Sequence, residues 1–254
     1  STDGCTVSVY AFVKSVQFCI HNIVFRKCLI FKNIQGVTIL NQIFKIEDLR
    51  PIRSGMTVSR DSKLGITNKV TYFSMGDDTS ISQESYDRMT MYIGAAGCGE
   101  FIIGKNQSIV PMEPGQVLIV PSKTLCGMQT STGMVYTEII LEKENTMNKN
   151  IKANEVFALK DLISYEEGSI ANMDVVSNPT MKYVLMAFDA GTGLTPHRAP
   201  GNAIVFALEG KATIGYEGKD YELNAGECFH FEKNGLHSVT ANEKFKMALL
   251  LVLE

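Results

Sequence analysis

The stretch from Gly191 to His237 decides the fold of this chain. It begins GTGLTPHRAPGNAIVFALEG (residues 191–210), continues to GECFHF (226–231) and ends on NGLH (234–237). Short apolar runs alternate with turns that contain Gly, Pro or Asn, at a spacing of roughly 8–12 residues. This alternation is typical of an all-β barrel or sandwich.

The chain repeats itself from about residue 37 onward. Residues 43–49 parallel 156–162 at an offset of 113, since 156 minus 43 is 113. Further along the offset is 111, so that Tyr72 matches Tyr183 and Gly115 matches Gly226. Apolar and glycine positions that recur in order predict two copies of one β-domain. We expect an N-terminal extension (1–36), a first copy (37–143) and a second copy (151–254), joined by the polar stretch 142–150.

Two histidines, His197 and His237, each follow a turn signal in the second copy. With the Leu208–Gly210 hairpin and the Ala225–Glu227 turn, they resemble the two conserved motifs of the cupin superfamily. The resemblance implies two tandem double-stranded β-helix (jelly-roll) barrels, a bicupin of the conserved-barrel type. It also implies a homodimer that forms through sheet packing.

The resemblance to the metal chemistry of that family is partial. Metal-binding members supply two histidines and a glutamate from the first motif and a third histidine from the second. On this chain His197 and His237 hold the first and last positions, while Ala199 and Ala203 replace the other two ligands. Asn202 is the nearest oxygen donor. Two imidazoles fall short of the three protein ligands typical of catalytic zinc.

Two interpretations of the histidine pair stay open. In one, His197 and His237 hold a single divalent metal (Zn, Ni, Fe or Mn). Cys228, His230 or Glu232, which alternate in phase along one strand, or water then complete the coordination. In the other, the imidazoles are polar groups in the mouth of the barrel and bind a small organic ligand together with Asn202.

The first copy carries no histidine at the matching positions. At the offset of 111, Tyr86 replaces His197, Arg88 replaces Ala199 and Cys126 replaces His237. A phenol and a guanidinium are suitable donors to a small carboxylate, so these three residues indicate an anion- or carbonyl-binding pocket. The alternative is a filled barrel in which Cys126 is inert and Arg88 faces solvent.

Composition excludes several classes of function. The net charge is −3 and no basic stripe occurs, which argues against nucleic acid and anionic membrane surfaces as partners. No apolar run reaches the roughly 18 residues of a membrane span. The six cysteines lack CxxC spacing and predict a reducing, cytoplasmic location.

Three functions fit these observations. The first is a bicupin that binds a small organic molecule in its C-terminal barrel with little or no catalysis. The second is a metal-dependent enzyme of the dioxygenase, decarboxylase or sugar isomerase type, with a reduced two-histidine site. The third is a structural role carried by the sheets themselves. The fold alone does not choose among them.

Overall fold

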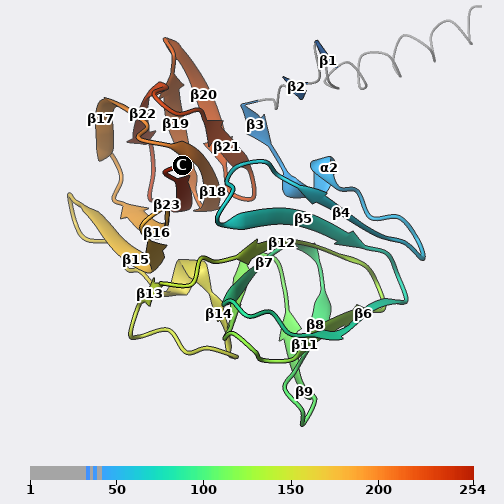
Figure 1. Ribbon diagram of the computed structural model, residues 1–254. Coiled ribbons are helices and arrows are strands. Elements are labelled where there is room, and N and C mark those ends of the chain that lie inside the picture. Colours follow the sequence, from blue (N-terminus) through green and yellow to red (C-terminus); the bar gives the residue numbers. More distant parts are fainter. Residues whose placement is uncertain (1–32, 35–36, 39–41) are drawn as a thin grey trace, which may run out of the picture. The chain divides into compact units, whose positions relative to one another are not determined.

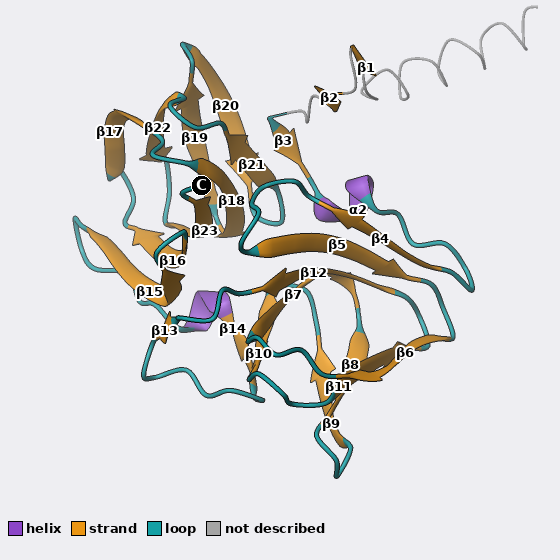
Figure 2. Cartoon of the chain, viewed as in Figure 1, coloured by secondary structure: helices purple, strands orange, loops and turns teal. Residues whose placement is uncertain are grey.

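The computed structural model describes residues 33–34, 37–38 and 42–254. The expected N-terminal extension therefore lies almost wholly outside the described residues. Strands β1 (Asn33–Ile34) and β2 (Val37–Thr38) form a small antiparallel sheet in one unit of the chain, and residues 42–254 form the other unit. Figure 2 shows the described chain as almost entirely strand and loop, which confirms the predicted all-β class.

The first copy forms two antiparallel sheets, which together are called the N-terminal barrel. A six-stranded sheet has the order β14-β10-β7-β12-β5-β4, and a four-stranded sheet has the order β6-β11-β8-β9 (Figure 1). The strands are β4 (Thr57–Asp61), β5 (Lys69–Met75), β6 (Thr79–Glu84), β7 (Thr90–Gly97), β8 (Gly99–Ile103), β9 (Ser108–Met112), β10 (Gln116–Val120), β11 (Cys126–Thr130), β12 (Met134–Ile140) and β14 (Val156–Ala158).

The second copy repeats this plan as the C-terminal barrel. Its larger sheet has the order β13-β15-β16-β23-β18-β21-β3, and its smaller sheet has the order β17-β22-β19-β20. The strands are β3 (Ile43–Phe44), β13 (Thr146–Met147), β15 (Ile170–Asn178), β16 (Met181–Phe188), β17 (Gly193–Arg198), β18 (Asn202–Glu209), β19 (Lys211–Tyr216), β20 (Lys219–Asn224), β21 (Cys228–Phe231), β22 (Leu236–Ala241) and β23 (Phe245–Val252).

The leading strands of the two copies are exchanged. β3 belongs to the first copy in sequence yet pairs with β21 of the second, where Phe44 lies opposite Cys228. β14 belongs to the second copy in sequence yet pairs with β10 of the first, where Phe157 lies opposite Val117. Each leading strand runs into a short helical turn, α2 (Ile46–Leu49) or η1 (Leu159–Asp161). The exchange joins the two barrels by backbone hydrogen bonds at two places.

Alternation along the strands separates three apolar clusters. Inward-facing side chains fill each barrel, with Tyr136 and Phe101 in the N-terminal barrel and Phe229 and Phe231 in the C-terminal barrel. The opposite faces of the two larger sheets pack on each other and form the largest cluster, which includes Tyr72, Tyr183, Ile93, Phe206 and Cys228. A strand of the larger sheets is therefore apolar on both faces, as expected for a central strand.

Strand β23 illustrates this rule. Its nearly continuous apolar run predicts a central position, and the structure places it between β16 and β18. The predicted hairpin at residues 216–221 is also confirmed: Gly218, with φ +79°, turns the chain between β19 and β20. Among the described residues, no helix is both long enough and apolar enough to span a membrane.

Candidate functional site

The two histidines of the second copy lie against each other. His197 on β17 pairs with His237 on β22, and their ring centroids are 4.1 Å apart. His237 is buried and shares the inward face of β22 with Val239 and Ala241, whereas His197 is exposed. The other neighbour of the His237 ring is Phe231, stacked with its centroid also at 4.1 Å.

Backbone carbonyls hold both rings. Nδ1 of His197 is 2.8 Å from the carbonyl oxygen of Thr195, and Nδ1 of His237 is 3.1 Å from that of Gly235. A carbonyl oxygen only accepts, so each Nδ1 is the donor, and within the described chain neither Nε2 atom has a hydrogen-bond partner. Burial lowers the pKa of His237; the carbonyl of Gly235 partly offsets this effect, and neighbouring His197 adds to it.

The remaining candidates in the second copy lie elsewhere. Oδ1 of Asn202 accepts a hydrogen bond of 3.2 Å from the backbone N–H of Lys233, so its amide holds the loop after β21. Cys228 belongs to the cluster between the barrels, and His230 shares its face of β21, because Phe229 and Phe231 take the inward positions. Glu232 lies beyond the end of that strand. The hypothesis that Cys228, His230 or Glu232 completes a metal shell inside the barrel is therefore wrong for Cys228 and His230.

The N-terminal barrel holds a cluster of ionisable side chains around Glu138. Glu138 is buried on β12 and lies directly opposite Tyr92 of β7. The hydroxyls of Tyr86 and Tyr92 lie close enough to its carboxyl group to favour its ionised form, and the Tyr92 hydroxyl does the same for the Cys126 thiol. Tyr136, two residues before Glu138, faces the same interior, and its buried hydroxyl has no partner within the described chain. We call these five residues the Glu138 cluster.

Burial dominates the electrostatics of this cluster. Desolvation raises the pKa of Glu138 to about 7, although Lys69 and the two tyrosine hydroxyls favour the ionised form. Desolvation likewise raises the pKa of Cys126 to about 11 and that of Tyr86 to about 12. Glu138 is therefore the member of the cluster that gains or loses a proton near neutral pH, as a general acid or base must.

Of the residues predicted in the first copy, the structure brings two together and separates the third. Tyr86 and Cys126 both join the Glu138 cluster. Arg88 instead donates from Nη1 to the carbonyl oxygen of Thr67, at 2.9 Å, and so fastens a loop. A cluster centred on a carboxyl group is a poor receptor for a second carboxylate. This geometry argues against the expected anion.

Comparisons with known proteins identify the fold. Residues 184–253 match the family model described as the cupin domain. The cupin 2 conserved barrel domain protein from Leptotrichia buccalis superposes with a TM-score of 0.73 at 26% identity, over 83% of this chain and 95% of that chain. The C-terminal barrel carries a cupin domain, and the chain has the cupin fold. This result confirms the predicted resemblance, and the two barrels described above are cupin jelly rolls.

More distant cupins share the fold over nearly the whole chain. A mutant of salicylate 1,2-dioxygenase from Pseudoaminobacter salicylatoxidans aligns with a TM-score of 0.58 at 13% identity, over 98% of this chain and 94% of that chain. A gentisate adduct of the same enzyme aligns with a TM-score of 0.56, also at 13% identity, over 98% of this chain and 91% of that chain. At such identity the likeness concerns the fold alone. The search of curated proteins found no match.

The donor set of the C-terminal barrel falls short of the metal site of metal-binding cupins. Within residues 33–34, 37–38 and 42–254, no group of three or more His, Cys, Asp or Glu side chains is arranged to hold a metal ion. His197 and His237 offer two Nε2 atoms without a third protein ligand. Alanines at 199 and 203, the second of them on the inward face of β18, add no donor. A catalytic zinc site needs at least one more ligand from the protein.

Sequence reasoning missed Tyr92, Tyr136 and Glu138. Glu138 is the lone charge in the apolar run MVYTEIIL (residues 134–141). A carboxylate in the middle of a strand that is apolar on both faces is the signal that could have found it, because buried carboxylates need partners. Tyr92 takes the position equivalent to Ala203, where the family carries its glutamate.

Proposed function

We propose that this protein binds a small organic molecule at the His197–His237 pair of its C-terminal barrel. The observation that carries the proposal is the geometry of the pair: two ring centroids 4.1 Å apart, with both Nδ1 atoms engaged by backbone carbonyls. Two Nε2 atoms at the mouth of a barrel form a ready receptor for hydrogen-bonding groups of one ligand.

The environment of the pair suggests the ligand's chemistry. His237 lies between Phe231 and His197, and its lowered pKa favours the neutral ring near pH 7. The Nε2 atom of a neutral ring whose Nδ1 donates is an acceptor. The favoured ligand therefore carries a hydroxyl donor on a flat body that packs against the exposed His197 ring.

Salicylate and gentisate are suitable first probes, because each carries a hydroxyl group on a flat ring and both appear in the names of structurally similar proteins. We expect calorimetric titration of metal-depleted protein to show binding that His197→Gln and His237→Gln each weaken at least tenfold. His230→Gln is the matched control, since His230 lies on the outer face of β21. Equal affinity of all three variants for the probe would show that the probe does not bind at the His197–His237 pair.

The alternative is a metal-dependent enzyme of the dioxygenase, decarboxylase or sugar isomerase type with a two-histidine site. Elemental analysis of protein purified without chelators separates the two functions. Iron, manganese, nickel or zinc at one equivalent per chain, lost in His197→Ala, would support the enzyme. Less than a tenth of an equivalent, together with binding of a probe by the metal-depleted protein, would support the organic ligand.

The Glu138 cluster favours a second candidate function, proton transfer in the N-terminal barrel. We propose that Glu138 acts there as an acid–base group toward an uncharged polar ligand, with Tyr86 and Tyr92 orienting its carboxyl group. Two observations support this proposal. The carboxyl group of Glu138 titrates near pH 7, and it lies between the hydroxyl groups of Tyr86 and Tyr92. Isotope exchange of acidic C–H protons in candidate ligands, compared between wild type and Glu138→Gln, tests this role.

A further inference from the structure

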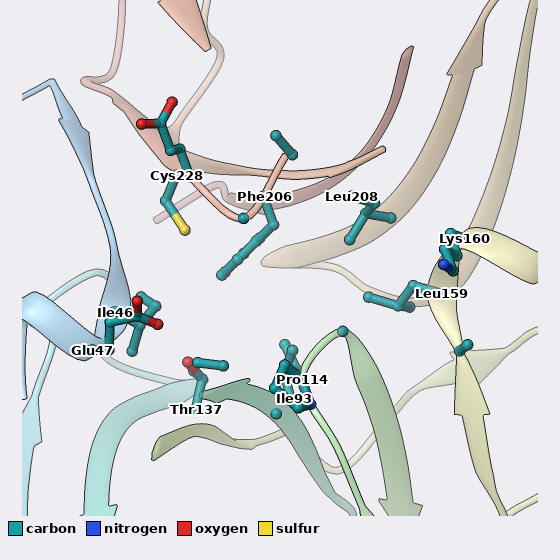
Figure 3. A pocket seen from close by; sticks show the side chains of 17 residues that line it. Ile46, Glu47, Ile93, Pro114, Thr137, Leu159, Lys160, Phe206, Leu208 and Cys228 are labelled. Carbon is teal, nitrogen blue, oxygen red and sulfur yellow. The ribbon is translucent and has the colours of Figure 1, made fainter. Parts of the chain in front are cut away.

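A cavity of about 250 Å³ lies between the two barrels and belongs to neither the histidine pair nor the Glu138 cluster. Its walls come from both copies of the repeat (Figure 3). Ile46 of α2 and Leu159 of η1 face it from matching positions, since 159 minus 46 is 113. Gly115 and Gly226 match in the same way at the offset of 111. The exchanged strands β3 and β14 therefore shape the cavity, because each carries its helical turn to the wall.

The wall is apolar apart from a few polar groups. Ile93, Phe206 and Leu208 supply much of it (Figure 3). The thiol of Cys228 also faces the cavity, and burial raises its pKa far above the usual range, so it stays protonated. Such a surface suits the apolar body of a ligand, and an uncharged thiol does not disturb it.

One buried hydroxyl in the wall lacks a partner. Thr137 on β12 is 1% exposed, and its Oγ1 atom has no hydrogen-bond partner in the described chain. Figure 3 shows this side chain directed into the cavity. Buried hydroxyls in folded proteins are nearly always hydrogen-bonded to protein or to water, so Thr137 can bond to a water or to a ligand in the cavity.

The charges at the two ends of the cavity differ. Glu47 of α2 and Lys160 of η1 occupy equivalent positions, since 160 minus 47 is 113. Glu47 is paired with Lys45 at 4.0 Å, and Glu227, also in the wall, accepts from the backbone N–H of Asn224 at 2.8 Å. The ammonium group of Lys160 has no ion-pair partner among the described residues. Of these two charged groups without an ion pair, Glu227 is held by hydrogen bonds from Asn224, whereas the ammonium group of Lys160 is available to a ligand.

We propose that this inter-barrel cavity binds a small amphipathic monocarboxylic acid, with its carboxylate at Lys160 and its apolar body between the two barrels. A cavity of about 150 Å³ holds benzene, so the present one takes a molecule of about ten non-hydrogen atoms. A carboxylate at Lys160 gains a charge-assisted hydrogen bond.

Calorimetric titration with octanoate tests the proposal, with octylammonium as the probe of opposite charge. We expect one octanoate per chain and at least tenfold weaker binding of octylammonium. Lys160→Met should weaken octanoate at least tenfold, and Ala95→Leu, which fills the cavity, should abolish binding. Lys219→Met, at an exposed hairpin of the C-terminal barrel, should leave the affinity unchanged.

Absence of octanoate binding, or equal affinity in wild type, Lys160→Met and Ala95→Leu, would overturn the proposal. Each variant is first checked for the dispersed amide NMR spectrum of the wild type. If Ala95→Leu fails this check, Leu208→Phe fills the cavity from its other wall. Since neither histidine of the C-terminal pair lines the cavity, the result is independent of the function proposed above.

Discussion

His197 lies directly opposite His237 on neighbouring strands, and the centroids of the two imidazole rings are 4.1 Å apart. At this separation two protonated rings repel each other, and the buried ring is the one that resists protonation. The two rings therefore form one coupled site, in which replacing or protonating one ring changes the pKa of the other.

The first prediction concerns the proton affinity of His237. Its pKa is lowered chiefly by burial and further by His197, so His197→Gln removes a neighbouring charge and uncovers the ring. We expect the pKa of His237 to rise toward its ordinary value. Proton NMR of the imidazole C2 resonance, followed through a pH titration, measures it. A pKa that stays the same or falls further would show that the rings are not coupled.

The second prediction concerns the Glu138 carboxyl group. Its pKa in the folded state is raised to about 7, above the value of 4.5 for an unperturbed glutamate. Because the folded state binds this proton more tightly than the unfolded state, the raised pKa stabilises the fold. The stabilisation is fully present below the pKa of the group in the unfolded chain, and it is lost as the pH rises through the pKa in the folded chain. Across this window the loss amounts to up to about 3 kcal/mol. Glu138→Gln should remove it.

Urea unfolding at pH 5 and pH 8 measures the effect. The free energy of unfolding of the wild type should fall between these two values by more than that of Glu138→Gln. Glu113→Gln, at an exposed position, is the control and should behave as the wild type does. An unchanged pH dependence in Glu138→Gln would mean that Glu138 is ionised in the folded barrel at both pH values.

The third prediction concerns the exchanged strands. Phe44 is buried where β3 joins the sheet of the other copy, so Phe44→Ala should lower the free energy of unfolding by about 3–5 kcal/mol. Ile109→Ala, at a side chain that is 60% exposed, should change it by less than about 0.5 kcal/mol. Equal stability of the two variants would show that β3 does not contribute to the C-terminal barrel.

Much of the fold could be predicted from local patterns. The turn glycines and the duplication of residues 43–49 in 156–162 indicate two β-barrels without any knowledge of contacts. The exchange of β3 and β14 could not be predicted in this way, because either strand has the same residue pattern whichever sheet it joins. Pairing between distant strands depends on packing that sequence periodicity does not describe.

The site was predicted less completely. The resemblance to the cupin motifs placed His197 and His237 at one site, and the two rings do lie side by side. The alternation in β21, in contrast, does not reveal which face is inside. Phe229 and Phe231 take the interior because they fill it, which turns Cys228 and His230 outward. Glu138 was missed because the resemblance to the cupin motifs gives its position no role, although the apolar run around it predicts its burial.

The most direct test of the account follows the histidine side chains of metal-depleted protein by NMR while a hydroxybenzoate probe is added. We expect the ring signals of His197 and His237 to shift together and to saturate at one equivalent, while those of His230 stay in place. Shifts that appear only after a divalent metal is supplied would contradict ligand binding by the metal-free histidine pair.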